Sequence, residues 1–96
     1  MSVCLVLHDL ADASAEAEKA FFEAIFEIAA DHWRVTPEAV LVGAEITPAY
    51  LRDHLRQALA SVGVVPALLL VTRVSEDLAW AGLPAASEAW LREMLE

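Results

Sequence analysis

Asp9, an aspartate at the end of an apolar run, is the residue of this chain whose position best suits metal chemistry. It follows Val3–Leu7 and His8, and five consecutive apolar residues are typical of a strand buried on both faces. A carboxylate at the end of such a strand is held rigidly yet reaches solvent, and hard cations such as Mg²⁺ favour oxygen ligands. One carboxylate is a poor site, whereas two contributed across a dimer axis would form a better one. The alternative is that Asp9 or Asp12 caps the following turn.

Other polar residues have spacings that could support binding. Arg52 and Arg56 are one helical turn apart and could contact a phosphate or an acidic partner. Alternatively, they are solvated, or they neutralise the acids of the first helix within the fold or across a dimer. His8 and Asp9 point to opposite faces of an extended strand and form no obvious joint site, and His54 is expected on a solvated helix face. The sequence carries no motif for zinc, for nucleotide phosphates or for a serine hydrolase.

The elements that position these residues follow from apolar periodicity and capping residues. Ser14 can cap a helix whose apolar stripe includes Phe21 and Ile25. Thr47-Pro48 opens a second helix, and Gly63 ends it. The predicted elements are a strand at Val3–Leu10, a helix at about Ser14–Ala30, strands at Trp33–Thr36 and Ala39–Ile46, a helix at Thr47–Val62, a strand at Val64–Val74, a short edge strand at Leu78–Leu83 and a helix after Pro84.

This order of elements indicates the fold class. Strand, helix, strand, strand, helix, strand predicts an α+β protein of the ferredoxin-like βαββαβ type, with a short extra strand and a C-terminal helix, as a single domain over residues 1–96. Thr36-Pro37 can also start a helix, but Val40 and Val42 favour a strand. Helices of such a fold cover one face of the sheet. The other face must meet something, and a second copy of the chain is the simplest candidate.

The composition also indicates a partner chain. The hydrophobic fraction is 58% in 96 residues, which is high because small domains have much surface to cover with polar atoms. We therefore expect a homodimer, with Leu70, Trp80 and Trp90 at its interface. The tryptophans suit packing better than base stacking, because no basic residues interleave with them.

Net charge, the cysteine count and the search for targeting signals indicate which partners and which location to expect. The net charge of −9, from 15 acids and 6 bases, counts against a nucleic-acid-binding protein, because such a field repels phosphate. The single cysteine, Cys4, permits no internal disulfide and is expected in the core. No apolar run is long enough to span a bilayer and no leader precedes Ser2, so we expect a cytoplasmic protein without membrane contact.

Four segments carry a resemblance to a known family: Ile46–Leu55, Ala67–Val74, Trp80-Ala81-Gly82 and Trp90–Glu93. They resemble the SinR-like small bacterial proteins, in which an (I/V)RDxL helix precedes an LLVV strand, a Trp-containing segment and a terminal Trp-Leu helix. Those proteins are similar in fold to CRISPR adaptation proteins and VapD-type ribonucleases. The resemblance implies a ferredoxin-like homodimer in which an aspartate of each subunit holds a divalent metal for phosphodiester cleavage. The matching residue here is Asp9, and His8 replaces the aromatic residue that precedes it in the CRISPR relatives.

We therefore expect a small, acidic, homodimeric ferredoxin-like protein that acts through protein contacts, without catalysis and without a cofactor. An alternative is a metal-dependent nuclease that uses Asp9 of each subunit with Mg²⁺ or Mn²⁺. A further alternative is an acidic inhibitor or nucleic-acid mimic, which would use Glu16, Glu23 and Glu27 of the first helix.

Overall fold

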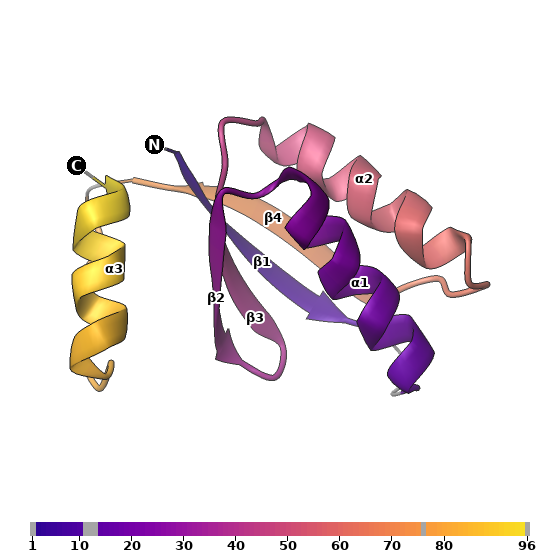
Figure 1. Cartoon of the computed structure of the whole chain (residues 1–96), viewed down its shortest axis with the longest axis horizontal. Coiled ribbons are helices and arrows are strands. Elements are labelled where there is room, and N and C mark those ends of the chain that lie inside the picture. The colour runs from indigo at the N-terminus through magenta and orange to yellow at the C-terminus, as the bar shows by residue number, and fades with distance from the viewer. Residues whose placement is uncertain (1, 11–13, 76, 96) are drawn as a thin grey trace.

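One antiparallel sheet and three helices form the part of the chain that the structure describes. The computed structural model describes residues 2–10, 14–75 and 77–95. In chain order the elements are β1 (Val3–Asp9), α1 (Ala15–Ile28), β2 (Asp31–Thr36), β3 (Ala39–Gly43), α2 (Pro48–Ala60), β4 (Leu68–Val74) and α3 (Ala85–Leu95). The strand order is β2-β3-β1-β4, with every pair antiparallel (Figure 1). The predicted α+β fold, with a ferredoxin-like βαββαβ order and a C-terminal helix, is confirmed.

The first two helices begin at the capping residues that the sequence indicates. Ser14 Oγ accepts a hydrogen bond from the Ala17 amide at 3.1 Å, and Thr47 Oγ1 accepts one from the Tyr50 amide at 3.1 Å. Each bond satisfies an amide that has no partner within its helix. After α2 the chain turns at Gly63, whose φ of 75° lies in the left-handed region that favours glycine.

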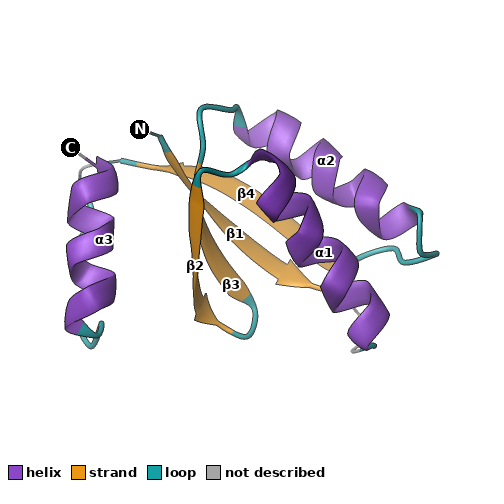
Figure 2. Ribbon diagram, viewed as in Figure 1, coloured by secondary structure: helices purple, strands orange, loops and turns teal. Residues whose placement is uncertain are grey.

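The main core lies between the sheet and the pair α1 and α2, which cover the same face (Figure 2). Alternation along β1 points Cys4 and Val6 toward the helices, whereas Val3 and Leu5 face the other side. Cys4 is therefore a core residue, as predicted. The helices contribute the large buried side chains of this core: Phe21, Ile25, Leu51, Leu55 and Leu59.

The third helix, α3, covers part of the opposite face (Figure 1). Leu91 is 2% exposed and packs with Val3 and Leu41 of the sheet. Gly43 permits the close approach, because a Cβ atom there would lie 3.3 Å from Met94 Sδ. We expected a second copy of the chain to meet this face, but one end of it is covered by the chain's own C-terminal helix.

One predicted element is wrong. The sequence predicts a short edge strand at Leu78–Leu83, but this segment forms bends and irregular backbone. Gly82 has a φ of 82°, which does not fit an extended strand, and alanine and glycine have low strand propensity. The side chain of Trp80 joins the cluster under α3 instead of a sheet.

The uncovered part of the second face lies along β4. Leu68 and Leu70 are 47% and 46% exposed, and Leu7 beside them is half-buried. Among the described residues, no helix is both long and apolar enough to cross a membrane.

Candidate protein interface

Asp9, the predicted metal ligand, is the exposed last residue of β1. It lies opposite Leu68 of β4, and its carbonyl oxygen accepts a hydrogen bond from the Ala67 amide at 2.8 Å. Within the described ranges, no group of three or more histidine, cysteine, aspartate or glutamate residues could hold a metal ion. Asp12, the other candidate for a turn cap, lies outside the described residues. Among the described residues of one subunit, Asp9 therefore lies at a strand end outside any such group.

His8 points away from Asp9, as strand alternation predicts, and lies beneath α1. It is 4% exposed, and its ring centroid is 4.4 Å from that of Phe21. Its Nε2 atom has no hydrogen-bond partner among the residues that the structure describes. Burial lowers the pKa of His8, and the charge of Arg34 lowers it further, while acids including Glu38 oppose the shift. His8 is thus a neutral core residue, which its register with Cys4 and Val6 could have revealed.

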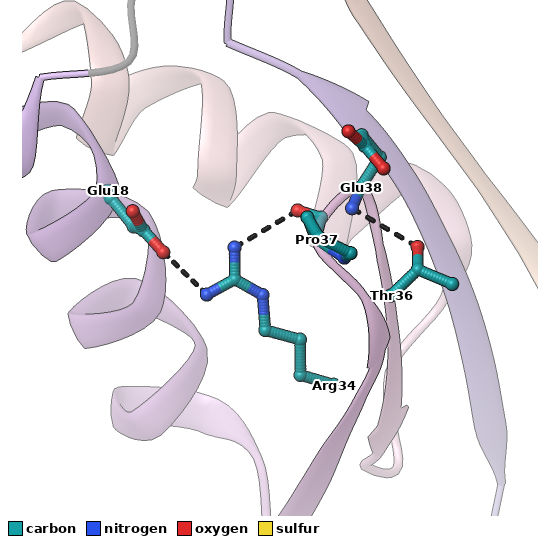
Figure 3. Close-up of polar contacts among 5 residues, drawn as sticks. All are labelled: Glu18, Arg34, Thr36, Pro37 and Glu38. Atoms are coloured by element: carbon teal, nitrogen blue, oxygen red, sulfur yellow. Dashed lines mark hydrogen bonds and ion pairs between the residues drawn. The ribbon is translucent and has the colours of Figure 1, made fainter.

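Arg34 connects α1 to the β2–β3 hairpin (Figure 3). Its guanidinium donates to the Glu18 carboxylate and, at 3.0 Å, to the Pro37 carbonyl oxygen. It also lies over the Phe22 ring, 4.8 Å from the ring centroid. Sequence reasoning missed this residue, because the register that brings β2 under α1 is not visible in a single sequence. Its hydrogen-bonding groups hold two elements together, which is a structural role.

The two arginines predicted to bind phosphate are exposed on α2, but a carboxylate lies between them. Arg52 Nε donates to Asp53 Oδ1 at 2.9 Å. The hydrogen bond from Arg52 lowers the pKa of Asp53, and the charges of Arg52 and Arg56 also lower it. A phosphate at these arginines would have to compete with Asp53. His54, expected on a solvated face, is half-buried, with Nε2 3.0 Å from the Ala24 carbonyl oxygen.

Two of the three residues predicted at a dimer interface make contacts within the subunit. Trp90 Nε1 donates to Asp31 Oδ2 at 2.6 Å, and Arg92 lies over the Trp80 ring at 5.0 Å. Both tryptophans pack in the cluster beneath α3. Leu70, the third predicted residue, remains on the surface at 46% exposure.

The backbone of β4 adds hydrogen-bonding groups to this apolar surface. The amide of His8 donates to the Glu38 carbonyl, and the amide of Ala44 to the Ser2 carbonyl, so the even-numbered residues of β1 bond to β3. The backbone amides and carbonyls of successive residues in a strand point to opposite sides, so the odd-numbered residues of β1 bond to β4. Their partners on β4 are also alternate residues. The amides and carbonyls that point away from β1 therefore belong to Leu69, Val71 and Arg73.

The two edge strands of the sheet, β2 and β4, differ in how well they are protected against the addition of another strand. β2 carries an irregular register between Arg34 and Thr36, charged residues, and Pro37 directly after it, which are features that discourage strand addition. β4 pairs with β1 in seven consecutive positions without a register shift. It has no proline, and Arg73 is its single charged residue. Among the described strands, none lies on its outer side.

The distribution of charge separates this edge from the acidic part of the protein. The acids Glu16, Glu23 and Glu27 are exposed on α1. Residues 54–75, from within α2 to the residue after β4, contain no aspartate or glutamate. The strand β4 itself therefore brings no carboxylate to a contact between two copies, and the nearest acids in the sheet and the sequence are Asp9, opposite Leu68, and Glu76 and Asp77, after the strand.

Comparison of the chain with protein-family models, curated proteins and solved structures finds no match. The resemblance to the SinR-like proteins therefore stays a prediction.

Proposed function

We propose that this protein is a small homodimeric interaction module that acts through protein contacts and without catalysis. The observation that carries the proposal is the exposed pair Leu68 and Leu70 on β4, within the acid-free part of the chain. Apolar surface removed from water contributes about 25 cal/mol per Å², and exposed apolar patches commonly mark interfaces. In the proposed homodimer, this patch of one subunit contacts the same patch of the second copy.

The placement of the other candidate groups supports a role without catalysis. His8 is buried and neutral beneath α1. Arg34 bonds to Glu18 and Pro37, and Arg52 bonds to Asp53. His8 and Arg34 contribute to the fold and Arg52 is paired with its neighbour, whereas Leu68 and Leu70 leave about half of their surface exposed.

Light scattering after size-exclusion chromatography tests the proposal. The wild-type protein should have the mass of a dimer, and Leu70→Lys should be a monomer with an unchanged circular-dichroism spectrum. Phe26→Lys is the matched control, because Phe26 is 63% exposed but lies on α1; this variant should remain dimeric. A wild-type monomer at every concentration would overturn the proposal.

The second candidate function is a metal-dependent nuclease with Asp9 of each subunit as a metal ligand. The exposure of Asp9 at the end of a rigid strand favours it. The test is cleavage of labelled RNA and DNA with Mg²⁺ or Mn²⁺ by wild type and Asp9→Asn. The interaction module predicts no cleavage, and equal cleavage by both proteins would exclude Asp9 as the catalytic residue. Cleavage that is lost in Asp9→Asn and in EDTA would establish the nuclease instead.

A further inference from the structure

We infer that two copies pair through the outer edges of β4, antiparallel to each other and related by a two-fold axis at Val71. The two sheets then form one continuous sheet through both subunits. This inference rests on the proposed homodimer, and it specifies which backbone groups and which register form the contact. A two-fold axis makes the interface self-complementary, as in most homodimers.

The direction of the backbone groups limits the two-fold axis to a position at a residue of β4, and full overlap of the two seven-residue strands selects Val71. Only residues whose amides and carbonyls point outward can form hydrogen-bonded pairs across the edge. These residues are Leu69, Val71 and Arg73, as the bonding pattern of β1 requires. An axis at Val71 pairs that residue with its own copy and Leu69 with the partner's Arg73. All seven residues of β4 then lie opposite a residue of the other subunit.

The side chains agree with this register. On the face that carries α3, Leu70 lies opposite the partner's Thr72, and Leu68 lies opposite the partner's Val74. The exposed leucines thereby gain apolar and β-branched neighbours of the kind that favour strand pairing.

The charged residue of β4 itself does not oppose the pairing. Arg73 is the single charged residue of β4, and it donates to Ser2 Oγ at 2.7 Å and to the Ile46 carbonyl at 3.2 Å within its own subunit. In the paired strands the two Arg73 residues lie four positions apart, about 14 Å at the usual rise of a strand. This separation exceeds the Debye length of about 8 Å at physiological ionic strength.

The same geometry keeps the two Asp9 residues apart. Asp9 lies opposite Leu68, and the two Leu68 residues are six positions apart in the proposed register. With three strand spacings between the two β1 strands, the Asp9 Cα atoms are about 25 Å apart. Two ligands of one metal ion cannot be that distant. An edge-paired dimer therefore holds no metal between its two Asp9 side chains.

Cysteine cross-linking tests the register. In a Cys4→Ala background, which removes the buried native thiol, Val71→Cys should form a disulfide-linked dimer under mild oxidation. Opposed residues in a hydrogen-bonded pair have Cα atoms about 5.5 Å apart, within the range of a disulfide. Leu69→Cys and Arg73→Cys alone should not cross-link, whereas the double variant carrying both should.

The outcomes distinguish this inference from the proposed function. A protein that is dimeric by light scattering but cross-links at Leu70→Cys, or at none of these positions, overturns the β4 register and leaves the homodimer standing. A monomeric wild type overturns both. Amide hydrogen exchange of the wild type needs no substitution: the amides of Leu69, Val71 and Arg73 should be protected in the dimer, and rapid exchange there would contradict the pairing.

Discussion

At the scale of single residues, His8 combines deep burial with an unpartnered polar atom. The ring packs on Phe21 and, at 6.3 Å between ring centroids, on Phe22, and within the described part of the chain its Nε2 atom has no hydrogen-bond partner. A charged imidazole here would lose much of its hydration, so burial, aided by the charge of Arg34, holds the pKa of His8 below its ordinary value of 6.5. The acids around it, Glu38, Glu18 and Asp9, oppose this shift but do not reverse it.

The lowered pKa predicts a loss of stability in mild acid. Below about pH 6.5 the unfolded chain binds a proton at His8 that the folded chain excludes, so the free energy of unfolding decreases as the pH falls. The stability that depends on neutral His8 is fully present above the ordinary pKa. Below it, this dependence lowers the free energy of unfolding by at most about 1.4 kcal/mol per pH unit. Urea denaturation of wild type and His8→Phe between about pH 7.5 and about pH 5.5 should show a steeper decrease for wild type.

The comparison with His8→Phe removes the contribution of the many carboxylates, since both proteins carry the same acids. An NMR titration of the His8 imidazole gives an independent measurement. Titration at or above the ordinary pKa, or parallel stability curves for the two proteins, would contradict the buried neutral histidine.

Arg34 is a partly exposed residue whose side chain makes several contacts between elements. Replacement by methionine keeps the length of the side chain but removes the bonds to Glu18 and Pro37 and the contact with Phe22. We expect Arg34→Met to lower the free energy of unfolding by about 1–2 kcal/mol, as the sum of modest terms at a partly exposed site.

Lys19→Met is the matched control for this prediction. Lys19 lies 3.8 Å from Glu23, and both side chains are mostly exposed, so the change should stay within about 0.5 kcal/mol. If chemical denaturation gives equal changes in the free energy of unfolding for the two substitutions, the contacts of Arg34 do not stabilise the fold.

At the scale of elements, α3 depends on docking rather than on its own propensity. A helix of eleven residues is marginal in water, and Leu91 is its most buried apolar residue. Leu91→Ala should therefore release α3 locally, because truncation of a buried leucine costs about 2–5 kcal/mol. Hydrogen exchange should accelerate in α3 amides while β1 and β3 remain protected.

Glu93→Ala, at an exposed position of the same helix, should leave exchange in α3 unchanged. If Leu91→Ala instead accelerates exchange equally in β1 and β3, then α3 and the sheet unfold as one cooperative unit and the local description is wrong.

Elements with both a cap and an apolar stripe could be predicted from the sequence. Ser14 and Thr47 mark the starts of α1 and α2 because a capping side chain acts over three residues. The segment around Trp80 could not be assigned this way, since its apolar residues pack under a helix that is distant in sequence. Periodicity reports which residues are buried, but not against which element.

The candidate site was predictable to a similar extent. The opposite directions of His8 and Asp9 follow from strand alternation alone. The bonds of Arg34 and the outward backbone groups of β4 depend on strand order and register, which form through long-range contacts. A single sequence specifies such register weakly. That β4 is an edge strand follows only from the pairing of β1 with both β3 and β4.

At the scale of the whole molecule, the charge is distributed unevenly. The chain carries a net charge of −9, yet residues 54–75 contain no acid. Two such molecules repel each other at long range, while the edge of β4 offers a contact without ion pairs between subunits. Salt screens the repulsion between the two negatively charged subunits but has little effect on apolar and backbone contacts at β4. It would weaken ion pairs in an alternative interface where Arg52 and Arg56 meet the acids of α1. The salt dependence of dimerisation therefore distinguishes the two interfaces.

Added salt should therefore strengthen the dimer. Raising NaCl from about 20 mM to about 200 mM shortens the screening length several-fold, which weakens repulsion between subunits but leaves apolar and backbone contacts intact. Sedimentation equilibrium should show a dissociation constant that falls several-fold. A variant with Glu16→Gln, Glu23→Gln and Glu27→Gln carries three fewer negative charges at sites away from β4, so its dissociation constant should depend less on salt. A wild-type dimer that weakens as salt rises would instead be held by ion pairs, and the β4 edge could not be its main contact.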